Sequence, residues 1–231
     1  MARTKQAVEY RELMVGAAIP TSLATATTET GGSPTVTKAA DHVALTLDNT
    51  NEAQAAVLYM GDKLCFDIDD LQAVEFIVEL DATPGTAVSV GIGVCSAQND
   101  TLDSITEGAF FRLDAGSLAI KVETDDGTNN KDDVATGFTL TAATKTKLRL
   151  NFRDGIKANI GSNSTGGKSA IQCAIDNGQG QLRPVNLNGT QLDMSNYSAG
   201  LQVFAQIAKA SGTATGTLKV YSVKVDHLKD I

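Results

Sequence analysis

The chain has 231 residues, of which 42% are hydrophobic, and its formal net charge is −8. This length is enough for one all-β domain with a sizeable core, and the acidic balance argues against nucleic acid as a partner, because phosphate binding needs a basic face. Three widely spaced cysteines, Cys65, Cys95 and Cys173, fit neither a disulfide framework nor a zinc site, so we expect free thiols.

Residues 1–40 differ in composition from the rest of the chain. The first twelve are rich in charge and suggest a short helix, and the following stretch is rich in Thr, Ala and Gly. Such a composition does not bury enough surface to fold by itself. We therefore expect an extended N-terminal arm that lies on its own domain, on a sister subunit or on another protein. Within this arm, Arg3, Lys5 and Arg11 are predicted to contact acidic patches of a partner.

Residues 41–231 are predicted to form the folded body, since apolar and polar residues alternate there in many short segments. In 73–80, for example, Val74 and Phe76 share one face, and Glu75 and Glu79 share the other. One-sided alternation predicts strands with one face on a core and one in water. The predicted strands are 43–48, 56–60, 63–68, 73–80, 87–95, 109–113, 117–123, 136–140, 146–153, 155–160, 170–175, 182–187, 200–208 and 217–226.

Helix signals are few in the predicted body. Short helices are predicted only at 51–58 and 101–107, and Gly108 would end the second. There is no alternation of strands with helices, which argues against a parallel α/β sheet. The pattern therefore predicts a large antiparallel β-sandwich. No apolar run reaches the length of a membrane span or of a signal-peptide core, so we expect no membrane partner and synthesis in the cytoplasm.

Two loops resemble ligand-binding motifs. GSNSTGGKS (161–169) has five residues between Gly161 and Gly167, where a phosphate-binding P-loop has four, and the following segment alternates like a strand, so we interpret it as a surface loop. DDGTNNKDD (125–133) concentrates oxygen ligands of the kind that calcium prefers, but its spacing does not match the EF-hand loop. A solvated loop is the favoured interpretation of 125–133, and a cation site is the alternative.

The usual catalytic constellations are missing from the sequence. Glu75, Glu79 and Asp81 share a strand face, but the paired-acid pattern of sandwich-fold glycosidases is not reproduced, and there is no Trp for sugar stacking. The only histidines, His42 and His227, lie at opposite ends of the body, which gives no local triad. We therefore expect a protein that is not an enzyme and that has no cofactor or metal.

The order of elements from about 73 to 228 resembles the concanavalin A-like, laminin-G-like jelly roll. The segments that carry the resemblance are VEFIVEL, SVGIGV, SLAIKVETDDG, TKLRLNFRDGIKANI and GLQVFAQIAKASGTATGTLKVYSVKVDHL. In that family a strand ending in Asp-Gly turns into its partner, as Asp154-Gly155 would do here. The resemblance implies an all-β, two-sheet antiparallel jelly-roll sandwich, to which the chain adds the extended N-terminal arm. The sugar and calcium ligands of the family have no recognisable counterpart.

The Ala-, Thr- and Gly-rich composition and the N-terminal arm also resemble tailed-phage virion proteins, in which such sandwiches occur as capsid decoration proteins and as tail modules. This resemblance implies a structural protein of the outer capsid surface that bridges subunits through its arm and sheet edges. Its partners would be the major capsid protein and sister copies, in a homotrimer. The alternative is a lectin-like module of a tail or fibre that binds a glycan. A glycoside hydrolase or lyase is the third hypothesis and needs two converging acids.

Overall fold

Two antiparallel sheets make up the computed structural model, which describes residues 5–114, 116–152 and 168–230. The first sheet, sheet A, has the strand order β14-β13-β12-β7-β16-β4-β3, with β1 beside β16. Its strands are β1 (Lys5–Leu13), β3 (Thr35–Lys38), β4 (Val43–Leu47), β7 (Leu71–Leu80), β12 (Thr146–Asn151), β13 (Gln172–Asp176), β14 (Arg183–Pro184) and β16 (Gly216–Asp230).

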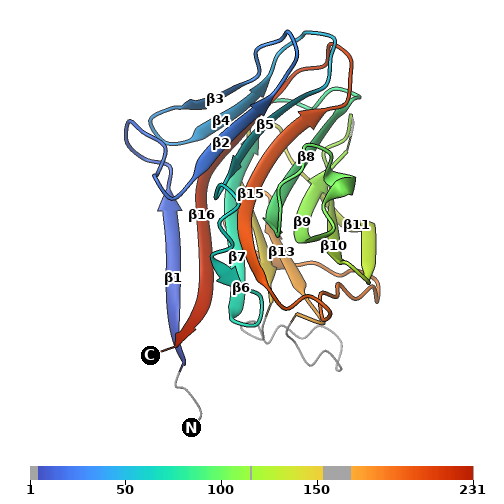
Figure 1. Cartoon of the computed structure of the whole chain (residues 1–231). Helices are drawn as coiled ribbons and strands as arrows, with labels where there is room; N and C mark the ends of the chain where they lie inside the picture. The colour runs from blue at the N-terminus through green and yellow to red at the C-terminus, as the bar shows by residue number, and fades with distance from the viewer. Residues whose placement is uncertain (1–4, 115, 153–167, 231) are drawn as a thin grey trace.

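The second sheet, sheet B, has the order β11-β10-β9-β8-β15-β5-β2, with β6 beside β15. Its strands are β2 (Ala24–Thr28), β5 (Gln54–Tyr59), β6 (Phe66–Asp67), β8 (Val88–Cys95), β9 (Glu107–Leu113), β10 (Ala119–Asp126), β11 (Asn130–Thr139) and β15 (Gly200–Lys209). Figure 1 shows the two sheets as curved layers packed face to face. The all-β, two-sheet sandwich predicted from the sequence is thereby confirmed.

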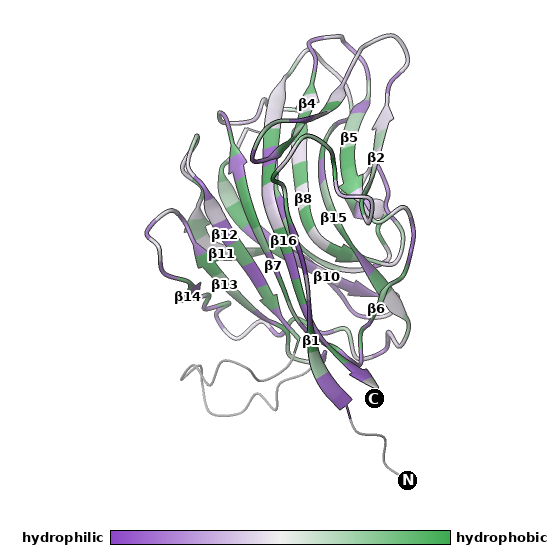
Figure 2. Ribbon diagram, turned by 90° about the vertical axis from the view of Figure 1, so that its left-hand side faces the viewer, coloured by the Kyte–Doolittle hydropathy of each residue, from purple (hydrophilic) through white to green (hydrophobic). Residues whose placement is uncertain are grey.

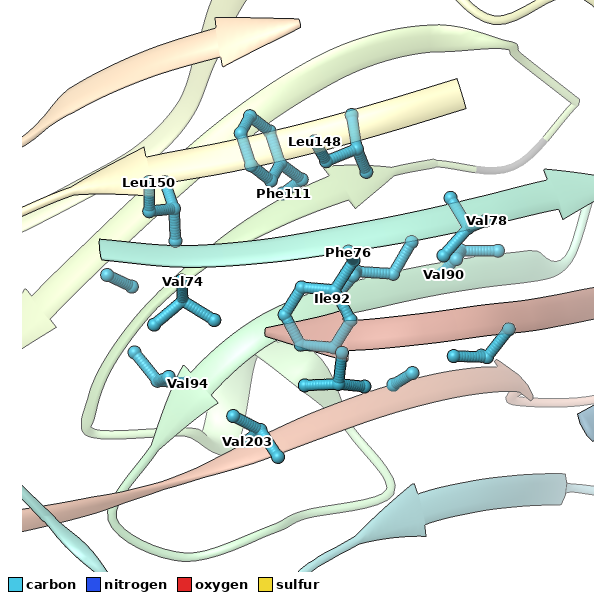
Figure 3. Close-up of a cluster of buried hydrophobic side chains, with 14 of the residues drawn as sticks. Val74, Phe76, Val78, Val90, Ile92, Val94, Phe111, Leu148, Leu150 and Val203 are labelled. Atoms are coloured by element: carbon cyan, nitrogen blue, oxygen red, sulfur yellow. The ribbon is translucent and has the colours of Figure 1, made fainter. Parts of the chain in front are cut away.

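The core lies between the sheets and contains the residues that the alternation assigns to the inner face. Val74, Phe76 and Val78 of β7 point toward Ile92 and Val94 of β8, and all five are at most 2% exposed (Figure 3). Hydrophobic and hydrophilic residues alternate visibly along β7 and β16 (Figure 2). Burial of each large apolar side chain stabilises the fold by about 1.5–3 kcal/mol relative to leaving it in water.

Residues 5–40, which the sequence predicts to form an arm, contribute strands to both sheets. β1 pairs with the second half of β16, β2 pairs with β5 in sheet B, and β3 pairs with β4 in sheet A. The 15 residues of β16 make this possible, because β4 occupies only the Gly216–Val220 part of that edge and leaves Ser222–Asp230 for β1.

The predicted helices are wrong. The first twelve residues contain β1, whose Tyr10 packs against Phe66 with ring centroids 5.6 Å apart. Segment 51–58 runs into β5, and of 101–107 only a single turn of 3₁₀-helix, η1 (Leu102–Ser104), is helical. In each case a sheet edge or face supplies backbone or side-chain partners, and these outweigh the weak local propensity. Among the described residues, no helix is long and apolar enough to cross a membrane.

Candidate functional site

The face of sheet B that points away from sheet A, called here the outer face of sheet B, carries two rows of cross-strand neighbours. In the first row Tyr59, Phe204, Gly93, Phe110 and Glu123 lie opposite one another on β5, β15, β8, β9 and β10. Two residues further along the strands, Gln206, Gly91, Arg112 and Lys121 form the second row. The face thus has aromatic rings and glycines at its centre and charged side chains on β9 and β10.

Residues 96–106, which connect β8 to β9 and are called here the strap, fold back over this face. Its residues Leu102 and Ile105 are buried in a separate apolar cluster with Cys95, Phe110 and Phe204. Gly91 makes room for the strap, because a Cβ at that position would come within 2.4 Å of Leu102 Cδ2. Figure 1 shows η1 in front of β8 and β9. Gly91 lies in the middle of β8, and its missing side chain leaves the space that Leu102 fills.

Buried amides fix the strap to the sheet. Gln206 has no exposed surface, its Nε2 donates to the Asp100 carbonyl at 2.9 Å, and its Oε1 accepts from Gln98 Nε2 at 3.2 Å. Both polar ends of the Gln206 side chain are therefore satisfied by strap residues. Since removing one partner of a buried hydrogen bond costs about 1–3 kcal/mol, Gln206 stabilises the packing of the strap on sheet B.

Arg112 organises the charged end of the face. Its Nε donates to Asp114 Oδ1 at 2.6 Å, its Nη1 donates to Glu123 Oε2 at 2.9 Å, and it also bonds Asp103 of the strap. The Glu123 side chain is only 3% exposed. Burial raises the pKa of Glu123 to about 7, against the opposing effect of the Arg112 charge. Such a shift is typical both of catalytic acids and of structural ion-pair networks.

At the other end of the face, Tyr59 and Asp62 form what we call the Tyr59–Asp62 rim. Tyr59 is half-buried, and within the described parts of the chain its hydroxyl makes no hydrogen bond. Asp62 is exposed and sits in the left-handed region with φ of 59°. Gln202, which is fully buried, accepts from the Asp62 N–H at 3.0 Å and donates to Asp62 Oδ1 at 2.7 Å. A partly exposed tyrosine, which packs against the apolar cluster of Phe110 and Phe204, and an exposed, pre-oriented carboxylate thus lie three residues apart at this end of the face.

The arm residues predicted to bind a partner are only partly described. Arg3 lies outside the described residues. Lys5 forms an ion pair with Asp70 of the same chain, and Arg11 is exposed on β1. Their contact with another protein stays a prediction.

The acidic segment 125–133 forms the turn between β10 and β11 together with the adjoining strand ends. Asp126 is a structural residue there, since it accepts from the N–H groups of Asn129 at 2.6 Å and Asn196 at 3.0 Å. Partial burial would raise the pKa of Asp126, but these hydrogen bonds outweigh that effect and lower it. Among the residues that the structure describes, no group of three or more His, Cys, Asp or Glu is placed to hold a metal ion.

The other sequence candidates do not converge on one site. Glu75 pairs with Arg149 at 3.3 Å, and Glu79 pairs with Lys219 at 2.7 Å, so this strand face is one of cross-strand ion pairs. His42 contacts Asp41, whereas His227 packs against Phe66. Most of the 161–169 loop lies outside the described residues.

The outer face of sheet B was not predicted as a site. Its signal in the sequence is the pair of glycines at alternate positions of SVGIGV, which indicates that something approaches the strand closely on that side. At Gly91 the approaching side chain is Leu102 of the strap, 11 residues further along the chain, and at Gly93 it is Phe110 of the neighbouring strand β9. The strap shows no motif of its own.

No protein-family model and no curated protein sequence matches the chain. Solved structures do match it. The Emp47p carbohydrate recognition domain has a TM-score of 0.60 at 10% identity, over 95% of this chain and 94% of that one. Peanut lectin has a TM-score of 0.57 at 9% identity (98% and 100% covered), and Bacillus licheniformis β-glucanase has 0.57 at 9% identity (94% and 97% covered). The chain therefore has the concanavalin A-like jelly-roll fold that lectins and glucanases share.

Proposed function

We propose that this chain is a non-catalytic carbohydrate-binding sandwich that recognises a neutral glycan at the Tyr59–Asp62 rim. The observation that carries the proposal is the exposed carboxylate of Asp62, which the fully buried Gln202 holds in place three residues after a half-buried tyrosine. The lectin-like fold of the neighbours supports the same class of function at a coarse level.

The chemistry of the rim suits a sugar. An aromatic ring packs against the apolar face of a pyranose, and a carboxylate accepts hydrogen bonds from sugar hydroxyls. Because Gln202 already orients Asp62, less side-chain freedom is lost on binding, which favours affinity. The net charge of −8 disfavours polyanionic glycans, so we propose neutral ones.

Binding rather than hydrolysis is supported by the state of the acids at the charged end. Among the structural neighbours are both glucanases and lectins, and the fold alone does not separate the two. A glycosidase needs two carboxyl groups that flank the scissile bond. Glu123 is enclosed and bonded to Arg112, and Arg112 also binds the exposed Asp103. Glu123 and Asp103 are therefore both bound to Arg112, and through it they link the strap to sheet B.

Calorimetric titration of the full chain with neutral gluco-, manno- and galacto-oligosaccharides tests the proposal. We expect binding that falls at least about tenfold in Tyr59→Ala and in Asp62→Ala, and that persists in Tyr59→Phe, which keeps the ring. Val15→Ala is the matched control, since Val15 is an exposed apolar residue outside the strands of sheet B.

Two results would overturn the proposal. One is the absence of binding across the glycan series, or binding that the two rim variants leave unchanged. The other is the release of new reducing ends during the titration, which would show catalysis.

The capsid decoration role inferred from the sequence, with the major capsid protein as partner, a homotrimeric assembly and a place on the outer capsid surface, stays a prediction. It rests on composition and on the N-terminal segment alone. The copy number of the protein in purified particles of its source would test it, because a decoration protein is present in a simple ratio to the major capsid protein.

A further inference from the structure

The guanidinium group of Arg112 is shared between the strap and sheet B. Its Nη1 donates both to Asp103 of the strap and to Glu123 of β10, the second at 2.9 Å. Two carboxylates that are bonded to the same nitrogen lie close together, and they repel each other when both are ionised. The Asp103 side chain is 69% exposed and the Glu123 side chain is 3% exposed. Of the two acids, Asp103 is therefore the one with room to leave.

The charged groups around Glu123 contain more acids than bases. They come from β9 and the residue after it, from the strap, from β11 and from β10 itself, and are Arg112, Asp114, Asp103, Asp132, Asp133, Lys121 and Asp125. The hydrogen bond to Asp114 raises the pKa of Lys121. Burial would lower the pKa of Arg112, but its hydrogen bonds to carboxylates raise it. Both bases therefore stay charged, and ionisation of Glu123 adds a negative charge to a cluster that is already negative.

Three attachments hold the strap on the outer face of sheet B. They are the apolar cluster of Leu102 and Ile105, the bonds of the Gln206 amide, and the ion pair between Asp103 and Arg112. The first two form between uncharged groups, so their strength does not change between about pH 5 and pH 8. The ion pair is different, because Glu123 competes for the same nitrogen of Arg112.

We propose that Glu123 and Arg112 form a pH-dependent latch for the strap. While Glu123 is protonated, Asp103 accepts from an Arg112 whose charge no other acid on that nitrogen neutralises, and the strap stays on the face. When Glu123 ionises, it competes with Asp103 and repels it. Opening of the strap then relieves this repulsion and lets water reach the Glu123 carboxylate. The open state exposes the aromatic rings of Phe110 and Phe204, which are at most 1% exposed under the strap.

The sign of the effect follows from proton binding. Burial raises the pKa of Glu123 to about 7, and contact with water returns it toward the ordinary value of 4.5. Between these two values the chain with the strap in place binds more protons than the chain with the strap open, so the open fraction rises with pH. The difference between 4.5 and about 7 sets the upper limit of this rise at about 300-fold.

Hydrogen–deuterium exchange of the full chain, at about pH 5 and about pH 8, tests the latch. After correction for the intrinsic effect of pH on amide exchange, we expect the protection of residues 96–106 to fall at least about tenfold at the higher pH. Glu123→Gln should remove this dependence. Glu29→Gln, which loses the same charge at an exposed position, is the matched control and should keep it.

Urea separates opening of the strap from unfolding of the domain. Strap opening exposes little surface, so exchange in residues 96–106 should change little at low urea concentrations, whereas exchange in β7, at the centre of sheet A, should follow global unfolding. Asp103→Asn removes the charge at the strap end of the ion pair. It should lower the protection of the strap at pH 5 and keep its dependence on pH, because Glu123 still titrates.

Four results would overturn the latch. They are a strap as protected as β7, a wild-type protection that does not depend on pH, a dependence on pH that Glu123→Gln retains, and an Asp103→Asn strap that is as protected at pH 5 as the wild type. The Asp103→Asn and wild-type measurements decide the question even if Glu123→Gln does not fold. The latch does not depend on the proposed glycan binding, because the exchange experiment contains no glycan.

Discussion

The buried carboxyl of Glu123 predicts an unusual dependence of stability on pH. Its pKa lies at about 7 in the folded protein, against an ordinary value of 4.5. At about 1.4 kcal/mol per pH unit, the difference corresponds to about 3 kcal/mol of folding free energy. Between the two values the folded chain binds more protons than the unfolded chain. The contribution of Glu123 is therefore full below pH 4.5, falls as the pH rises to about 7, and is constant above that.

The comparison with Glu123→Gln isolates this contribution. Glutamine keeps the size of the side chain and can still accept a hydrogen bond from Arg112, but it does not titrate. The free energy of unfolding of both proteins would be measured by urea titration at a series of pH values. We expect the stability of the wild type relative to Glu123→Gln to fall by about 3 kcal/mol between pH 4.5 and about 7. Acids that are common to both proteins, such as Asp126, cancel in the difference.

Glu29→Gln, at an exposed position after β2, controls for the loss of one negative charge. A stability difference between wild type and Glu123→Gln that is flat over this pH range, or that rises with pH, would refute the reasoning. It would mean that the attraction of Arg112 exceeds the cost of burying the charge.

Two further predictions concern packing and thiol access. Leu102→Ala should lower the free energy of unfolding by about 3 kcal/mol, and Gly91→Ala should also lower it. In urea titrations the double variant should lose less stability than the sum of the two single losses, because the truncated side chain at 102 leaves room for the new methyl group at 91. If the losses of stability in the two single variants add up in the double variant, the proposed packing of Leu102 on Gly91 is contradicted. Of the three thiols, exposed Cys65 should react rapidly with a disulfide reagent in the native protein, whereas Cys95 and Cys173 should react only on unfolding, since burial raises the pKa of both. Rapid reaction of two thiols per chain in the native protein would contradict this prediction.

The sequence predicts the strands best where side chains alternate in a long run. In β7 and β8 each apolar residue at every second position is buried, because both strands lie with one face on the core. The prediction fails where the partner of a segment is far along the chain. β1 looked helical from its charges, yet it is a strand because β16 extends beyond β4 and offers it an edge. The residues around β1 give no information on the length of β16, which lies about 200 residues further along the chain.

The amino-acid sequence by itself determined the all-β class, the two-sheet sandwich and the inward face of most strands, since a period of two is a local property of the chain. Only the tertiary structure decided the candidate sites. In the folded chain Leu102 packs over Gly91, Arg112 donates a hydrogen bond to Glu123, and Gln202 donates one to Asp62. These contacts depend on strand order and register, which arise from pairing over long sequence separations and leave no periodic trace in the chain.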